Sequence, residues 1–223
     1  MSRHTVSSSV IKRLPRYYRF LGELAKQNLT RISSRELSEL MGLTASQIRQ
    51  DLNCFGTFGQ QGCGYNVREL HDAIGNILGV NAVNKTIIIG AGNLGKAIAT
   101  HVDFTKRGCR LVGIFDINPD LFGKVISGIS VQDINELEAF CAKNHPNVAV
   151  LCIPKTSAQE LANKLVELGI TGFWNFSHYD LPRKNENIVV ENVHLGDSLM
   201  VLAYNVNSLP DEKSHDIQDN CLA

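Results

Sequence analysis

The sequence contains no long apolar run, no paired cysteine motif and no excess of either charge. Its longest apolar stretches, Thr86–Ile89 and Val148–Ile153, are strand-sized and far short of the roughly 18 residues of a membrane span. The six cysteines include no Cys-x-x-Cys pair, which argues against a disulfide framework and against a zinc site. The first ten residues lack the apolar core of a signal peptide. We therefore expect a soluble, cytoplasmic protein with free thiols, no membrane segment and no metal.

The balance of charge hides an asymmetry along the chain. Lys and Arg number 22, as do Asp and Glu, and 43% of the residues are hydrophobic, which argues against disorder. Residues 1–80 nevertheless hold ten basic and six acidic side chains, so the rest of the chain is acidic. A basic N-terminal part is a candidate for contacts with nucleic-acid phosphates, with ordinary surface charge as the alternative.

The first part of the chain has the periodicity and capping signals of helices. Apolar residues recur at helical spacing over residues 14–24, with Pro15 either in the first turn or at a kink. Ser33-Ser-Arg-Glu36 and Thr44-Ala-Ser-Gln47 each fit a capping box and open two short helices, the second ending at Gly56. Two short helices separated by a tight turn indicate a helix-turn-helix.

The segment after these helices is rich in glycine. Residues 56–65 would allow the tight β-hairpin that forms the wing of a winged helix, and the apolar spacing of residues 67–78 predicts one more helix. A small helical cap without a role in DNA binding is the alternative. The basic charge and the capped helices favour DNA.

From Lys85 onwards the pattern changes to short apolar strands alternating with helices, after a junction at Gly79–Asn84. This alternation predicts a parallel sheet covered by helices on both faces. The expected strands are Thr86–Ile89, Leu111–Phe115, Val148–Ile153 and Thr171–Trp174. The expected helices are Ala97–Phe104, Ile134–Cys141, Ala158–Leu168 and Gly196–Val206, with a loop at Pro182–Asn187.

A glycine motif comes directly after the first of these strands. In the G-x-G-x-x-G pattern, Gly90 would make the tight turn, Gly92 would let a pyrophosphate approach the backbone, and Gly95 would let the helix pack on the strand. Asp116 stands 21 residues after Gly95, close to the spacing of the carboxylate that binds the adenosine ribose. No Arg comes just after Asp116 to accept the extra phosphate of NADP, so NAD(H) is favoured.

The chain shows no catalytic constellation. A dehydrogenase needs a substrate domain and an acid/base partner, and after the junction there is room for about one dinucleotide fold. His178 is the one histidine in a plausible loop after a strand, and a structural or surface role fits it better. The alternatives are a small NAD-dependent oxidoreductase with an N-terminal oligomerisation cap and a regulator that reads another nucleotide such as CoA. Asp116 argues against CoA.

Several strings of residues, spread from about Val10 to Val206, carry a family likeness. They are Arg13-Leu-Pro-Arg-Tyr-Tyr-Arg19, Ser33-Ser-Arg-Glu-Leu-Ser38, Gln47-Ile-Arg-Gln-Asp-Leu52, Phe58-Gly together with Gly62-Cys-Gly-Tyr-Asn-Val67, Gly90–Gly95, Phe115-Asp116, Asn175-Phe176 and Glu191-Asn-Val193. With the wing string and the glycine motif in one chain, the sequence resembles the Rex family of bacterial redox-sensing transcriptional repressors.

The resemblance implies a homodimer whose winged helices bind palindromic double-stranded operator DNA. NADH would close the dimer and release the DNA, whereas NAD⁺ would permit repression. The implied fold is α/β: a winged helix-turn-helix domain over residues 1–80, a Rossmann-type NAD(H)-binding domain over residues 81–195, and a C-terminal swapped helix and tail over residues 196–223. The swapped helix would lie near the partner's cofactor site.

The motifs and the resemblance together define the candidate site residues. The cofactor-binding set is Gly90, Ala91, Gly92, Asn93, Leu94, Gly95, Asp116, Ile153, Pro154, Asn175 and Phe176. The DNA-binding set is Arg13, Arg16, Ser46, Gln47, Arg49, Gln50, Gln60, Gln61 and Tyr65. No residue is assigned a catalytic or metal-binding role.

The chain departs from the commoner family pattern in a few places. Gln50 replaces a basic residue, Gln60-Gln61 replaces a basic wing pair, and Val102 replaces a tyrosine after the first Rossmann helix. Gln50 favours adenine over guanine, so the operator preference is expected to be altered.

One further departure concerns how the ligand state reaches the DNA. The resemblance places Arg19 near an acidic position that precedes the swapped helix, where a charge pair can bias two states. Here that position is His194, which offers no charge attraction when it is neutral. Asp197 lies about one helical turn further on. We therefore predict that Asp197, not His194, carries the coupling to Arg19.

Overall fold

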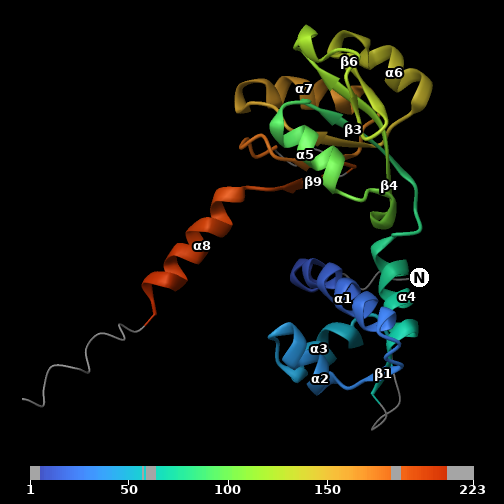
Figure 1. The fold of residues 1–223 in the computed structure, drawn as a ribbon, viewed down its shortest axis with the longest axis vertical. Coiled ribbons are helices and arrows are strands. Elements are labelled where there is room, and N and C mark those ends of the chain that lie inside the picture. Colours follow the sequence, from blue (N-terminus) through green and yellow to red (C-terminus); the bar gives the residue numbers. More distant parts are fainter. Residues whose placement is uncertain (1–5, 57, 59–63, 182–186, 210–223) are drawn as a thin grey trace, which may run out of the picture. The chain divides into compact units, whose positions relative to one another are not determined.

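The protein is represented by a computed structural model, which describes residues 6–56, 58, 64–181 and 187–209 (Figure 1). The chain splits into two compact units. The first comprises Met1–Val83 and Asp103–Arg110, and the second comprises Asn84–Val102 and Leu111–Ala223. The sequence did not indicate that Asp103–Arg110 belongs with the first unit.

The first unit is mainly helical. Its elements are α1 (Ser8–Lys26), β1 (Arg31–Ile32), α2 (Ser34–Met41), α3 (Ala45–Asn53), β2 (Tyr65–Asn66), α4 (Val67–Leu78) and the 3-10 turn η1 (Thr105–Arg107). The helices predicted from apolar periodicity are confirmed, and Pro15 lies inside α1. The periodic side chains make one core of fully or nearly fully buried residues, which includes Leu14, Tyr17, Leu21, Leu37, Met41, Ile48, Leu52, Leu70 and Ile74.

The first capping box is confirmed and the second is only half formed. Ser33 Oγ accepts from the amide of Glu36 at 3.1 Å, and Glu36 Oε2 accepts from the amide of Ser33 at 2.8 Å. Thr44 Oγ1 accepts from the amide of Gln47 at 3.1 Å, but the Gln47 side chain turns away to another partner. The prediction that α3 ends at Gly56 was wrong, because the helix ends at Asn53.

The predicted wing lies largely outside the described residues, since 57 and 59–63 are not among them. After it, the chain forms a short strand with a distant partner. Strand β2 pairs antiparallel with β1, with Ile32 opposite Tyr65 and Arg31 opposite Asn66. Sequence reasoning missed β1, because a two-residue strand has no periodicity to detect.

The second unit is built on a seven-stranded sheet in the order β5-β6-β4-β3-β7-β8-β9. The strands are β3 (Asn84–Ile89), β4 (Cys109–Asp116), β5 (Val125–Ile126), β6 (Ile129–Asp133), β7 (Val148–Leu151), β8 (Gly172–Asn175) and β9 (Val189–Asn192). Apart from β5, their order is 3-2-1-4-5-6 in chain sequence, the order of dinucleotide-binding Rossmann domains. The sheet is mixed rather than purely parallel, because β5 runs antiparallel to β6.

Helices cover both faces of this sheet, as the alternation of strands and helices predicts. They are α5 (Asn93–His101), α6 (Leu137–Asn144) and α7 (Lys155–Glu167), with the 3-10 turns η2 (Pro119–Leu121) and η3 (Ile134–Glu136). Ile87 and Ile89 of β3 share a core with α6 and α7. Ile88 points to the opposite face, where α5 packs, and all three isoleucines are buried.

The predicted element bounds needed correction. Helix α5 begins four residues before the predicted Ala97 and ends at His101 instead of Phe104, while β7 ends at Leu151 and not at Ile153. Glycines and prolines mark these helix starts, and such residues carry no apolar periodicity. Strands β5, β6 and β9 were missed because they are short and flanked by polar residues. Of the predicted loop Pro182–Asn187, residues 182–186 lie outside the described part.

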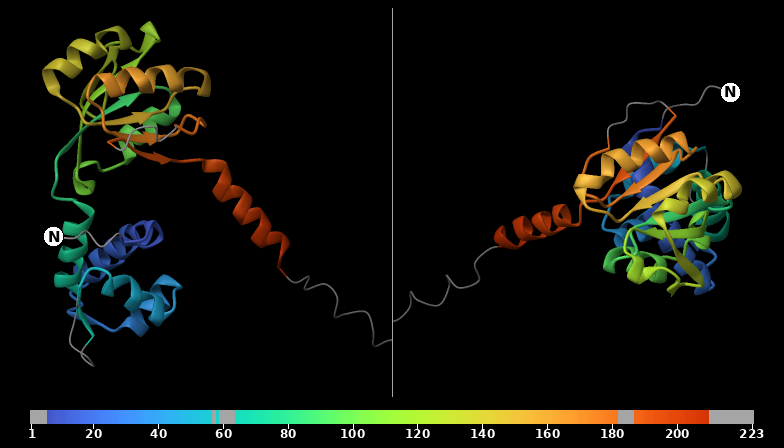
Figure 2. Two further views of the ribbon diagram at one scale, coloured as in Figure 1. Left: turned by 180° about the vertical axis from the view of Figure 1, so that it is seen from behind. Right: turned by 90° about the horizontal axis from the view of Figure 1, so that it is seen from above.

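The last described element is α8 (Leu195–Asn207), close to the predicted Gly196–Val206. It has no buried residue, although much of it is apolar. Figure 2 shows it as a single helix that continues from β9. Its exposed large apolar side chains are Leu195, Leu199, Met200, Val201, Leu202, Tyr204 and Val206. Across the described residues, no helix is both long and apolar enough to span a membrane.

Candidate functional site

The glycine motif forms the connection between β3 and α5. Gly90 has a φ of 97°, and a β-carbon there would lie 2.4 Å from the carbonyl oxygen of Cys152. A β-carbon on Gly95 would lie 1.8 Å from the carbonyl oxygen of Gly90. A β-carbon on Gly92 would meet nothing within 4 Å. Gly90 and Gly95 are therefore required by the protein itself, whereas Gly92 faces open space.

The open space at Gly92 adjoins the N-terminus of α5. Gly92 is the N-cap of this helix and supplies no side-chain hydrogen bond to it. The first amides of a helix have no intrahelical partner and carry the positive end of the helix dipole, so they bind anions. The arrangement therefore provides a site for a phosphate or pyrophosphate against bare backbone.

Asp116 ties the glycine turn to the end of β4. Its Oδ2 accepts from the amide of Ala91 at 2.6 Å, and its Oδ1 accepts from the amide of Asn118 at 2.8 Å. A carboxylate offers about four lone-pair sites, so acceptor capacity remains for ribose hydroxyls. Asp116 thus holds the turn in shape as well as presenting a carboxylate beside it, a role that its spacing from Gly95 did not reveal.

The other predicted cofactor residues divide into two groups. Ile153 lies beside the turn, since a β-carbon on Gly90 would be 3.2 Å from its Cγ2, and Pro154 is the N-cap of α7. The amide nitrogen of Asn175, by contrast, donates to the carbonyl of Tyr179 at 2.6 Å and to Asn192 Oδ1 at 2.8 Å.

The Asn175 side chain is fully buried and its amide oxygen accepts from both the amide and the hydroxyl of Ser177. Both donors of its carboxamide are therefore engaged inside the protein. The carboxamide thus fixes the loop after β8, and a cofactor contact by Asn175 stays a prediction. Phe176, next to it, is 9% exposed and packs edge-to-face on Trp174 at 4.9 Å.

Cys152 lies next to the glycine turn, where its carbonyl oxygen faces Gly90. Burial raises the pKa of the Cys152 thiol to about 12, so it is protonated at neutral pH. The cysteines that the structure describes, namely Cys54, Cys109, Cys141 and Cys152, are all free thiols. Among the described residues, no three His, Cys, Asp or Glu side chains come together to hold a metal ion.

In the first unit, the predicted DNA-reading residues lie on α3. Ser46, Arg49 and Gln50 are exposed and, at spacings of three and four residues, share one face of the helix. Arg49 Nη1 donates to Ser34 Oγ at 3.0 Å. The structure thus brings these three predicted residues together on one surface.

Two other predicted DNA contacts are engaged inside the unit. Arg13 donates through Nε and Nη2 to the two carboxylate oxygens of Asp51, both at 2.7 Å. Gln47 Nε2 donates to Asp51 Oδ1 at 2.8 Å, and the Tyr17 hydroxyl donates to Oδ2 at 3.0 Å. Arg13 and Gln47 are therefore partners of a buried carboxylate, and their role in DNA binding stays a prediction.

Sequence reasoning missed Asp51, although a signal for it exists. The apolar face of α3 contains Ile48 and Leu52, and Asp51 falls within the same face, where it is fully buried. An acid on the apolar face of a helix needs an internal partner, because a buried charge without one is costly. Burial alone would raise the pKa of Asp51, but hydrogen bonds from Arg13, Gln47 and Tyr17 outweigh it and hold that pKa below its ordinary value.

The remaining DNA candidates are Arg16, Tyr65, Gln60 and Gln61. Arg16 donates to the carbonyl of Met41 at the end of α2, where helix carbonyls lack partners. Tyr65 is half-buried, which raises the pKa of its hydroxyl. Gln60 and Gln61 lie outside the described residues.

The predicted coupling residues have local partners. Arg19 is exposed and its guanidinium lies over the Phe20 ring at 5.6 Å. His194 Nε2 lies 3.0 Å from Asp180 Oδ1, and its ring stacks on His178 with centroids 5.8 Å apart. Asp197 is exposed in the first turn of α8.

Comparison with known proteins places both units in described families. The chain matches the family model for a putative DNA-binding protein N-terminus over residues 5–53 and the model for a CoA binding domain over residues 81–179. It is 56% identical to the redox-sensing transcriptional repressor Rex of Caldanaerobacter subterraneus over 93% of this chain and 92% of that protein. It is 54% identical to the Rex repressor of Clostridium perfringens over 91% of this chain and 95% of that protein.

Solved structures give the same result as the sequence comparisons. The fold is similar to a crystal structure of RSP in complex with beta-NAD+ and operator DNA, with a TM-score of 0.85, 55% identity and coverage of 92% of this chain and 94% of that one. It is also similar to RSP in complex with beta-NADH, with a TM-score of 0.83, 52% identity and coverage of 92% and 96%. A helix-turn-helix unit on the same chain as a Rossmann unit defines a ligand-responsive transcriptional regulator. The chain belongs to the Rex family of redox-sensing transcriptional repressors.

Proposed function

We propose that this protein represses transcription by binding operator DNA through α3 and leaves the DNA when its second unit binds NADH. The observation that carries the proposal is the bare helix N-terminus at Gly92, with Asp116 beside it, in one chain with the exposed face of α3. The RSP structures with beta-NAD+ and operator DNA and with beta-NADH support the same pair of ligands here.

For the cofactor, the pyrophosphate rests on the backbone from Gly92 to Gly95 and the adenosine ribose on Asp116. Ile153 and Pro154 line the same end of the sheet. Ala91, Asn93 and Leu94 contribute backbone around the phosphates, and Phe176 contributes its aromatic surface.

For the DNA, Arg49 is the residue best suited to a bidentate contact with guanine, and Gln50 to a contact with adenine. Ser46 lies beside them at the start of the recognition helix, the end that normally reaches base edges. The phosphate backbone of the DNA is contacted by Arg16 and Tyr65 and by the wing residues Gln60 and Gln61.

The proposal includes a homodimer that binds a palindromic operator in the cytoplasm. Helix α8 supports the dimer, because a helix with exposed apolar side chains and no buried residue needs a partner surface. Two-fold symmetry of the protein then matches two-fold symmetry of the operator.

Coupling between the ligand and the DNA is assigned to Arg19 and Asp197. His194 already lies against Asp180 and His178 within its own unit, whereas Asp197 is exposed in the first turn of α8. A switch needs a contact that differs between its two states, since a ligand that binds both equally shifts nothing. Asp197 supplies the charge that His194 lacks when it is neutral.

A CoA-responsive regulator is the second candidate, favoured by the CoA binding domain match over residues 81–179. The carboxylate of Asp116 argues against it. An oxidoreductase is disfavoured, because the relatives are named as transcriptional repressors.

The test is a gel shift with palindromic operator DNA titrated with NADH, NAD⁺ or CoA. We expect NADH to release the DNA and NAD⁺ to leave the complex intact. Gly92→Val should bind operator normally but not be released by NADH, because its side chain fills the space for the pyrophosphate. Gly92→Ala tests whether a single methyl group is enough to prevent that release. Release by CoA alone, or turnover of NADH with a substrate and no operator binding, would reject the proposal.

A further inference from the structure

The helix pair α1–α3 contains a hydrogen-bonded carboxylate cluster, made of Arg13, Tyr17, Gln47 and Asp51, which we call the Asp51 cluster. Arg13 and Tyr17 are four residues apart on α1, and Gln47 and Asp51 are four residues apart on α3, so each pair shares one helix face. All the donors converge on one carboxylate that is 0% exposed. Among the described residues, Asp51 is the one acidic or basic side chain that is buried.

Such a cluster is a poor means of adding stability alone. Removing a carboxylate from water is costly, and a buried ion pair can often be replaced by apolar side chains with no loss of stability. A bidentate Arg–carboxylate pair does restrain geometry, because its two parallel hydrogen bonds fix the relative orientation of the two groups. Here those groups belong to α1 and α3, so the pair fixes the rotation of α3 about its own axis.

That rotation decides which side chains of α3 are offered to DNA. At 100° per residue, Gln47 and Asp51 lie roughly a third of a turn from the centre of the face that carries Ser46, Arg49 and Gln50. Arg13 and Tyr17 hold Asp51 against α1, and with α3 in this rotation the other face of the helix is exposed, as observed. A rotation of α3 that turned Gln47 towards this face would carry Arg49 away from its centre.

The cluster also engages two side chains that can read bases. Arg pairs with guanine and Gln with adenine through the same donors that Asp51 occupies here. Asp51 therefore keeps the predicted base-contacting face of α3 exposed. It also keeps Arg13 and Gln47 from contacting bases themselves. Specificity commonly depends on such exclusion as well as on favourable contacts.

We infer that Asp51 is the positioning residue that sets operator selectivity, by fixing the rotation of α3 and by holding Arg13 and Gln47 away from the DNA. The inference rests on the proposed DNA-binding function. It concerns the ratio of operator affinity to non-operator affinity, not the existence of binding.

The decisive variant is Asp51→Asn, which keeps the shape of the side chain and removes its charge. A carboxamide cannot accept from both arms of Arg13, so the guanidinium is released. We expect selectivity to fall about tenfold or more, the scale of losing one good base contact. Non-operator affinity should rise, with its log–log salt slope steeper by about 0.9 if the freed Arg13 neutralises one phosphate. NADH affinity should not change.

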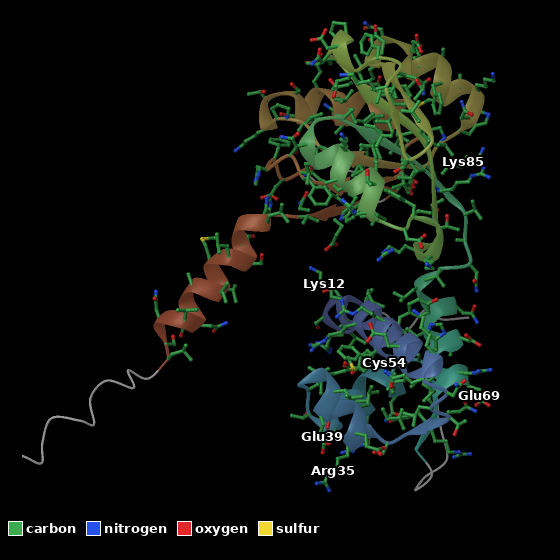
Figure 3. The ribbon with its side chains drawn as sticks, in the orientation of Figure 1. Lys12, Arg35, Glu39, Cys54, Glu69 and Lys85 are labelled. Carbon is green, nitrogen blue, oxygen red and sulfur yellow. The ribbon has the colours of Figure 1, made fainter. Side chains whose placement is uncertain are left out.

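The matched control is Glu39→Gln, which makes the same change of charge in the same unit. Arg35 and Glu39 form a surface pair at 3.4 Å on α2, with side chains 87% and 67% exposed (Figure 3). Exposed pairs contribute little. Selectivity and salt slope should stay at wild-type values in this variant, which separates the Asp51 cluster from a general effect of charge.

Should Asp51→Asn fail to fold, the double variant Arg13→Met with Asp51→Leu replaces the pair by apolar side chains and restores packing. Loss of selectivity in a folded variant supports the inference. Wild-type selectivity in either folded variant overturns it. If the wild-type protein itself shows no preference for operator DNA, the proposed function fails instead, and the two failures are thereby distinguished.

Discussion

The two units of this protein differ in the groups that form their proposed functional surfaces, which are side chains in one unit and backbone in the other. In the first unit, a charged side chain buried between helices orients the exposed face of α3. In the second unit, the site at the end of β3 is mostly backbone, and its turn is shaped by missing β-carbons at Gly90 and Gly95. The proposed DNA-binding surface thus depends on side-chain identity, and the proposed cofactor surface depends on backbone geometry.

The two units should therefore tolerate different substitutions. A backbone site fails when any atom is added where two segments touch, and it is indifferent to atoms added in open space. A side-chain site fails when a donor or acceptor is lost, even if volume is conserved. Substitutions in both units, and a change of pH, test this contrast with effects that range from large to small.

The largest effect is expected from Gly95→Ala. Its β-carbon would lie 1.8 Å from the Gly90 carbonyl oxygen, so α5 must move away from the turn. We expect a loss of about 3 kcal/mol in unfolding free energy, at the upper end for overpacking, together with loss of NADH binding. Denaturant titration measures it. Gly92→Ala is the control and should unfold like the wild type. Equal stability of the two variants would contradict the claim that only atoms added at a close backbone contact are harmful.

The next largest effect is expected from Asp116→Ala. The variant loses the acceptor for the Ala91 amide as well as the ribose contact. NADH affinity should therefore fall by roughly 10- to 100-fold, as for loss of a charge-assisted hydrogen bond, and rejection of NADPH should relax. Calorimetric titration with both nucleotides measures it. Unchanged nucleotide choice would show that Asp116 serves the turn alone.

Acid should weaken the first unit through Asp51. Because the pKa of Asp51 is held below its ordinary value in the folded state, the unfolded chain takes up the proton first as pH falls. The stability from this group is complete near neutrality and is lost from about pH 5 downwards as pH passes towards the folded pKa. Unfolding of the wild type and of Asp51→Asn should be compared across that range. If the unfolding free energy fell equally steeply with pH in both proteins, other groups would cause the acid sensitivity.

A smaller and more specific effect is expected in the coupling of NADH to DNA release. Asp197→Asn should weaken NADH-induced release several-fold while operator affinity without NADH changes little, because only the biasing charge is removed. The same gel shift on His194→Ala is the comparison. Loss of response in His194→Ala alone would transfer the coupling to His194.

The smallest effect is expected on the surface of the first unit. Glu39→Gln breaks the exposed pair with Arg35 and should change the unfolding free energy by at most about 0.5 kcal/mol. Thermal melting in low and high salt measures it. A larger change would mean that surface charge, and not the buried cluster alone, shapes this unit.

Much of the fold was predictable because its signals are local. Apolar periodicity located α1, α4 and α8, a capping box located the start of α2, and the glycine spacing located the turn before α5. Strands β1, β5 and β9 were not predictable in this way, since each is short and is defined by its pairing with another segment of the chain. The membership of Asp103–Arg110 in the first unit is likewise a long-range result.

The site residues divide along the same line. Local spacing along a strand, a turn or a helix was enough to predict the glycines, Asp116 and the exposed residues of α3. The packing of separate elements brings Arg13 to Asp51, Asn175 to Asn192, and the Asp116 carboxylate to the Ala91 amide. The physical reason is that a hydrogen bond between residues remote in sequence depends on how separate elements pack, and one-dimensional spacing carries no record of that packing.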